Sequence, residues 1–114
     1  MLRITTWRIT AAPPPDTTPM AAMQAFGYMC STLERVQGAG RIRFYLGDGG
    51  IVTVGEPESY AVADSILTSR DAQVAVAKVL SLGYNIAEDH FLLEPTQVRP
   101  FTEAASAVPA GARR

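Results

Sequence analysis

The segment RIRFYLGDGGIVTV, residues 41–54, predicts a β-hairpin. Ile42, Phe44 and Leu46 alternate with two arginines and a tyrosine, which is the period of a strand with one apolar face. The GDGG sequence between the two runs supplies residues that readily adopt the positive φ angles of a tight turn. The returning run at 51–54 is apolar on both faces, so we expect this strand to be covered on both sides.

The rest of the chain predicts two helical regions and two more strands around this hairpin. Thr18 followed by Pro19 is typical of a helix N-cap and first helical residue, and Thr68 with Asp71 has the spacing of a capping box. The expected elements are, in order, a strand at 2–10, a helix from Pro19 to about Gly38, the hairpin, a short helix from Pro57, a helix at 70–82 capped by Thr68, and a strand within 88–98. This βαββαβ order predicts an α+β, ferredoxin-like domain with a four-stranded antiparallel sheet at 1–101, followed by a flexible C-terminal tail at 102–114.

The predicted sheet has one face that its own helices cannot cover. Helices in this order lie on one side only. We expect the other face to carry Trp7, Arg43 and Tyr45 together with half of the third strand. Soluble monomers rarely expose a mixed surface of this size, so the sequence predicts a homodimer that joins sheet to sheet.

The composition excludes several classes of function. Lys and Arg number 10 and Asp and Glu number 11, which gives a net charge of −1 and argues against nucleic-acid binding. One cysteine and one histidine leave no basis for a disulfide framework or a metal site, and we expect neither a metal nor a cofactor. Residues 17–33 carry no charge, but polar residues interrupt them, so no membrane span is predicted. The N-terminus lacks the apolar core of a signal peptide, and a cytoplasmic protein is expected.

Three segments together resemble the dimeric α/β-barrel superfamily: the hairpin at 41–54, the stretch GEPESYAVAD at 55–64 that opens a broken second helix, and the closing strand HFLLEP at 90–95. This superfamily includes antibiotic-biosynthesis monooxygenases, polyketide cyclases, haem-degrading enzymes and muconolactone isomerases. The resemblance covers about residues 2–100 and implies a homodimer whose two sheets close into a barrel. It also implies a pocket between sheet and helices that holds a small hydrophobic organic substrate. His90 lies in a predicted strand, whereas the haem-degrading branch needs an iron ligand on a helix, so that branch is disfavoured.

His90, Tyr45 and Arg43 are the candidate catalytic residues. The ordinary pKa of histidine lies nearest neutrality, which suits His90 to general acid–base chemistry. Tyr45 and Arg43 would polarise a substrate oxygen. These roles predict a cofactor-independent cyclase or isomerase of secondary metabolism that acts on a hydrophobic, oxygenated substrate of polyketide-like or aromatic type. The alternative for His90 is an exposed histidine or one in the dimer interface.

The candidate substrate-binding residues are apolar and lie mostly on the first helix: Trp7, Met23, Phe26, Met29 and Cys30. Methionines give a pocket wall that adapts to hydrophobic ligands, although core filling explains the same pattern. Cys30 has no basic neighbour in sequence and is expected to be a buried, unreactive thiol.

Two alternative functions stay open. The first is a cofactor-free monooxygenase, in which Trp7 and Tyr45 would steer a substrate carbanion towards oxygen. The second is a non-catalytic ligand-binding or accessory dimer, which the small supply of catalytic side chains favours. Oxygen consumption during turnover separates the first from a cyclase.

Overall fold

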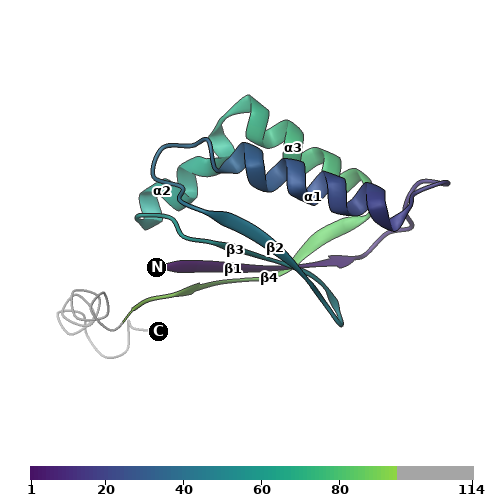
Figure 1. Cartoon of the computed structure of the whole chain (residues 1–114), viewed down its shortest axis with the longest axis horizontal. Helices are drawn as coiled ribbons and strands as arrows, with labels where there is room; N and C mark the ends of the chain where they lie inside the picture. The colour runs from purple at the N-terminus through teal and green to yellow at the C-terminus, as the bar shows by residue number, and fades with distance from the viewer. Residues whose placement is uncertain (95–114) are drawn as a thin grey trace, which may run out of the picture.

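The computed structural model describes residues 1–94, and the predicted tail at 102–114 lies outside the described residues. The elements are β1 (Leu2–Ile9), α1 (Pro19–Leu33), β2 (Ile42–Gly47), β3 (Gly50–Gly55), α2 (Tyr60–Ser65), the 3₁₀ turn η1 (Ile66–Thr68), α3 (Arg70–Ser81) and β4 (Tyr84–Leu92). The strands form one antiparallel sheet in the order β2-β3-β1-β4. The helices of residues 1–94 all lie on one side of it (Figure 1). The predicted α+β, ferredoxin-like fold is therefore confirmed.

Local signals fix the hairpin and the start of the first helix. Gly47 pairs with Gly50, so the turn contains only Asp48 and Gly49, as the GDGG sequence predicts. The Thr18 side chain accepts a hydrogen bond from the backbone N–H of Ala21 at 3.1 Å and caps α1.

Several predicted boundaries are wrong. Helix α1 ends at Leu33 rather than near Gly38, and α2 begins at Tyr60 rather than at Pro57. Ser69, not Thr68, caps α3, because the Thr68 hydroxyl donates to the carbonyl of Ser65 and closes the 3₁₀ turn.

The last strand also begins earlier than the predicted segment 88–98. It starts at Tyr84 because Gly83, with a φ of 95°, turns the chain directly out of α3. The Gly83 carbonyl accepts the backbone N–H of Thr10 at 2.8 Å, and this bond starts the pairing of β4 with β1. Most of β4 therefore precedes the apolar run at 90–93, the expected centre of this strand.

Trp7 lies on the opposite face of the sheet from the one predicted. Arg3, Thr5 and Trp7 face the helices, and Trp7 is only 5% exposed. Its indole lies edge-on to the ring of Phe26, with centroids 5.6 Å apart, and Phe26 is completely buried. Burying the rings of Trp7 and Phe26 against each other stabilises the fold more than burying Leu2 and Ile4 would. These two aliphatic residues of β1 therefore face the other side of the sheet.

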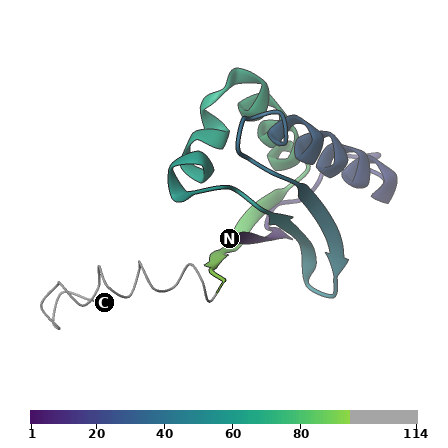
Figure 2. The same cartoon turned by 60° about the vertical axis from the view of Figure 1, so that its left-hand side comes forward.

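The other face of the sheet, called the open face here, carries no helix of the described chain (Figure 2). It combines half-buried aliphatic residues of the two central strands with polar residues near the edges. Its residues are Leu2, Ile4, Thr6, Arg43, Tyr45, Val52, Val54, Glu88, His90 and Leu92. Within residues 1–94, no helix has the length and apolar character needed to cross a membrane.

Candidate ligand pocket

A small apolar pocket lies between the sheet and the helices. Its volume is about 80 Å³, and β1 and β3 form its floor while α1, α3 and the segment 57–67 form its walls. Most of the lining is aliphatic or aromatic, and the polar lining comes from Arg3, Thr5 and Thr53. Among the described residues that line it there is no aspartate, glutamate or histidine.

Trp7 forms a rigid part of the pocket floor. The indole Nε1–H donates to the Thr53 hydroxyl oxygen at 3.0 Å, which satisfies a buried donor and fixes the ring plane. The ring of Phe26 supports the indole from behind, and the ring of Tyr84 meets Phe26 edge-on at 5.1 Å. The pocket therefore offers a preformed aromatic surface to a ligand.

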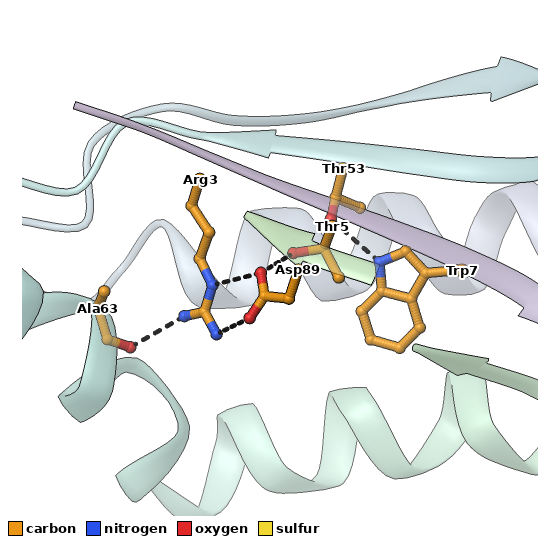
Figure 3. A network of polar contacts seen from close by, with 6 residues as sticks. All are labelled: Arg3, Thr5, Trp7, Thr53, Ala63 and Asp89. Carbon is orange, nitrogen blue, oxygen red and sulfur yellow. Dashed lines mark hydrogen bonds and ion pairs between the residues drawn. The ribbon is translucent and has the colours of Figure 1, made fainter. Parts of the chain in front are cut away.

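A polar network lies on the same floor, further along β1 (Figure 3). Arg3 donates from Nε to Oδ1 of Asp89 at 3.1 Å and from Nη2 to Oδ2 at 2.8 Å. Its Nη1 donates to the carbonyl oxygen of Ala63 in α2 at 3.2 Å. The Thr5 hydroxyl donates to Oδ1 of Asp89 at 2.9 Å. This network joins the first strand, the last strand and the short helix beside the pocket.

The network holds both charged groups in their ionised forms. The hydrogen bond from Arg3 lowers the pKa of Asp89, with a further contribution from Thr5, and these effects exceed the opposing effect of burial. The hydrogen bond to Asp89 raises the pKa of Arg3, which also lies 5.3 Å from the centroid of the Phe91 ring. Asp89 is therefore a poor proton acceptor, and Arg3 is a permanent cation with a fixed orientation.

The three predicted catalytic residues lie on the open face, on the far side of the sheet from this pocket. His90 pairs with Ile4 and shares its face of the sheet. Ile4 lies between the pocket residues Arg3 and Thr5 on β1, so Ile4 and His90 point away from the pocket. The strands that carry Arg43 and His90 form the two edges of the sheet, three strand spacings or about 14 Å apart. Arg43 and Tyr45 are neighbours on β2, but within one subunit the structure does not bring His90 close to them, and the catalytic role of all three stays a prediction.

His90 and Tyr45 are also largely exposed on the described chain. The His90 side chain is 64% exposed, and its Nε2 lies 3.8 Å from Oε1 of Glu88. Tyr45 is 50% exposed. Both positions are compatible with the alternative of an interface residue.

The predicted substrate-binding residues are divided among three environments. Trp7 and Met29 line the pocket, whereas Phe26 is fully buried in the core behind it. Met23 is 39% exposed and borders a second hollow of about 320 Å³ between the start of α1 and the hairpin.

The thiol of Cys30 is buried among the core residues of α1. Burial, and secondarily the charge of Glu34, raises its pKa to about 11. This value agrees with the expectation of an unreactive thiol. Among residues 1–94, no three His, Cys, Asp or Glu side chains gather where they could hold a metal ion.

The sequence did not identify Arg3, Thr5 and Asp89 as site residues. Arg3 and Asp89 are 86 positions apart, so no local pattern connects them. The available signal was the strand period, which places Arg3 and Thr5 on the same face as Trp7.

Comparison with known proteins identifies the fold but no sequence family. No family model and no curated protein matches the sequence. The structural neighbours are ferredoxin-like proteins that include dimers, antibiotic-biosynthesis-monooxygenase-like proteins and a cofactor-independent oxygenase. All of those described below are less than 25% identical to this chain, so the likeness concerns the fold alone.

Three of these neighbours illustrate the kinds of protein that share this fold. A protein from Nitrosomonas europaea, provisionally assigned as an antibiotic biosynthesis monooxygenase, has a TM-score of 0.58 and 15% identity over 82% of this chain and 100% of its own. SnoaB, a cofactor-independent oxygenase from Streptomyces nogalater, has a TM-score of 0.58 and 10% identity over 81% of this chain and 94% of its own. A dimeric ferredoxin-like protein of unknown function from Thermobifida fusca has a TM-score of 0.58 and 14% identity over 81% of this chain and 89% of its own.

Proposed function

We propose that this protein is a homodimeric, cofactor-independent enzyme that oxygenates a small hydrophobic substrate in the pocket between its sheet and its helices. The observation that carries the proposal is an apolar pocket with a fixed tryptophan on its floor and one oriented arginine beside it. The presence of an oxygenase among the structural neighbours favours oxygenation over cyclisation or isomerisation.

The proposed chemistry suits a substrate that carries its own reactive electrons. A CH₂ group next to a carbonyl or a phenolic ring loses a proton and forms a carbanion, which reacts directly with O₂. The net change is CH₂ + O₂ → C=O + H₂O, so the substrate supplies the electrons and no other reductant is needed. The described pocket lining contains no carboxylate or imidazole, and this favours a substrate acidic enough to ionise when a cation is nearby.

We propose that the dimer forms through the open face of the sheet. Ile4, Val52 and Val54 lie half-buried at its centre, whereas Tyr45 and Leu92 are each 50% exposed around them. A second copy would remove this apolar area from water. His90, Tyr45 and Arg43 would then lie between two sheets. We place the dimer in the cytoplasm, where the single buried thiol stays reduced.

An oxygen-electrode assay with anthrone as the probe tests the function. Anthrone has one activated CH₂ group, and its conversion to anthraquinone consumes one O₂ and releases one water. Its three rings exceed the pocket volume of about 80 Å³, so the pocket wall must move when it binds. We expect O₂ uptake equal to anthraquinone formed, at a rate above that of the buffer, and a loss of this rate in Trp7→Ala. Tyr28→Ala, an exposed aromatic residue of α1 away from the pocket lining, is the matched control.

Other outcomes point to the alternative functions. Conversion of related enolisable ketones without O₂ uptake would support the cyclase or isomerase. Tight binding with no product over hours would support an accessory dimer.

A further inference from the structure

We propose that a second copy of this chain completes a polar cluster on the open face, in which Arg43 and Tyr45 of one copy bind the Glu88 carboxylate beside His90 of the other. This inference rests on the dimer of the proposed function and adds to it the orientation of the two copies and the contacts between them. It is carried by the register of the strands and by the distribution of charge over the face.

Two rows of residues cross the open face, with one residue from each strand in each row. From β2 to β4, the first row is Arg43, Val54, Ile4 and His90, and the second row is Tyr45, Val52, Thr6 and Glu88. The central residues of both rows are half-buried, whereas the four residues at the edges are exposed. The face therefore has a mainly aliphatic centre and polar edges.

The two edges of this face carry opposite charge. Arg43 on β2 has no ion-pair partner within residues 1–94. On β4, Oε1 of Glu88 lies 3.8 Å from Nε2 of His90, and these side chains are 55% and 64% exposed. A further arginine, Arg8, extends over Gly49 of the hairpin turn, at the end of the face. The basic edge and the acidic edge are too far apart to neutralise each other within one subunit.

A two-fold axis parallel to the strands turns this face onto itself. The sheet order β2-β3-β1-β4 then places β2 of one copy opposite β4 of the other, and β3 opposite β1. Rotation about this axis leaves the height along the strands unchanged, so each row faces the same row of the second copy. Arg43 therefore meets His90, and Tyr45 meets Glu88. Packed sheets are usually rotated by about 30°, which displaces the edges by about one residue, a distance that an arginine side chain covers.

Charge selects this axis over the alternative. A two-fold axis across the strands places β2 opposite β2 and β4 opposite β4. It would bring two copies of Arg43 together at one edge and two copies of Glu88 together at the other. Like charges that face each other across an interface are costly, whereas the axis along the strands joins each basic edge to an acidic one.

The donors and acceptors of the cluster are matched in this arrangement. The guanidinium of Arg43 and the hydroxyl of Tyr45 donate hydrogen bonds, and the carboxylate of Glu88 has about four acceptor positions. A carboxylate that a second copy removes from water is costly unless it is paired, and Arg43 supplies the opposite charge. The second copy also brings His90 next to Arg43 and Tyr45, from which it is separated within one subunit.

Charge reversal tests the pairing of Arg43 with Glu88. Sedimentation equilibrium of the full chain measures the dissociation constant of the dimer. Arg43→Glu and Glu88→Arg should each weaken the dimer at least about tenfold, the factor typical of one charge-assisted hydrogen bond. The double variant exchanges the two charges and should return to within about threefold of the wild type. The control is Arg35→Glu, which reverses an exposed charge just after α1, on the helix side of the sheet, and should leave the dissociation constant unchanged.

Chemical cross-linking tests the orientation of the two copies. Arg43→Cys chains are mixed with His90→Cys chains and treated with a short bismaleimide, since packed sheets lie about 10 Å apart. We expect a covalent dimer in the mixture and none with either variant alone. Cys30 is buried and does not compete for the reagent.

The other outcomes separate this inference from the proposed function. A dimer that both charge reversals leave unchanged, or a double variant no tighter than the weaker single variant, would overturn the Arg43–Glu88 contact. Cross-linking of Arg43→Cys with itself would show the axis across the strands and overturn the arrangement. In each of these cases the dimer and the pocket of the proposed function stand. A wild type that stays monomeric at all concentrations would overturn the dimer of the proposed function together with this inference.

Discussion

Phe26 supports both the core and the floor of the pocket, so its replacement by alanine is the most informative test of how the two are linked. The Phe26 ring is completely buried. It meets Trp7 and Tyr84 edge-on, at centroid distances of 5.6 and 5.1 Å, and it lies 6.1 Å from the ring of Phe44. Neighbouring rings with fixed planes cannot collapse easily into the space that alanine would leave.

The expected destabilisation follows from this packing. Phe→Ala changes in cores cost about 3–5 kcal/mol, and the rigid surroundings place Phe26→Ala near the upper end of that range. Phe26→Leu keeps most of the volume and loses two edge-to-face contacts of about 0.5–1.5 kcal/mol each, so we expect a loss of about 1–3 kcal/mol. Since small domains are stable by about 5–15 kcal/mol, a loss near 5 kcal/mol in Phe26→Ala should remove about a third or more of the stability.

Urea unfolding at one fixed protein concentration measures these losses, because the stability of a dimer depends on concentration. Trp7 fluorescence and far-UV circular dichroism follow the transition. Met20→Ala is the control on the same helix, since Met20 is 59% exposed and should change stability by no more than about 0.5 kcal/mol. A loss below about 2 kcal/mol in Phe26→Ala would refute the rigid aromatic core.

Four further predictions follow from single groups. The pKa of Asp89 is lower in the folded protein than in the unfolded chain, where it is about 3.9. The ionised carboxylate therefore stabilises the fold fully at pH values above about 3.9, and this stabilisation is lost as the pH falls through the lower pKa of the folded state. Asp89→Asn removes the group and should flatten the acid side of a plot of Tm against pH. Cys30, with a pKa of about 11, should react with a thiol reagent at pH of about 8 only after unfolding. Val54→Asp puts a charge on the open face and should convert a dimer into monomers in analytical ultracentrifugation while the circular dichroism spectrum is retained. Leu67→Ala removes part of the pocket wall and should improve the binding of naphthalene relative to benzene in a Trp7 fluorescence titration.

Features that depend only on neighbours along the chain were predictable from the sequence. Alternation and the GDGG turn defined the hairpin, and Thr18 with Pro19 defined the start of α1, because a strand period, a tight turn and an N-cap each depend on a few consecutive residues. The order of these elements was then sufficient to predict the ferredoxin-like fold.

The facing of β1 and β4 depends on packing between segments that are distant in sequence. The alternation in β1 shows that its two faces differ, but each face combines polar with apolar residues: Arg3, Thr5 and Trp7 on one, and Leu2, Ile4 and Thr6 on the other. Only packing against Phe26 decides which set faces the helices. In β4 a bulge opposite Thr6 and Trp7 inserts an extra residue.

The bulge shifts the inward and outward alternation of β4 by one residue. Ile86 pairs with Trp7 and Asp89 pairs with Thr5, so Ile86 and Asp89 lie on the same face although they are separated by an odd number of positions. The bulge therefore gives Asp89 to the pocket side, where it orients Arg3, and leaves His90 on the open face. A strand period cannot reveal this arrangement, because the bulge and the ion pair both depend on contacts between residues at opposite ends of the chain.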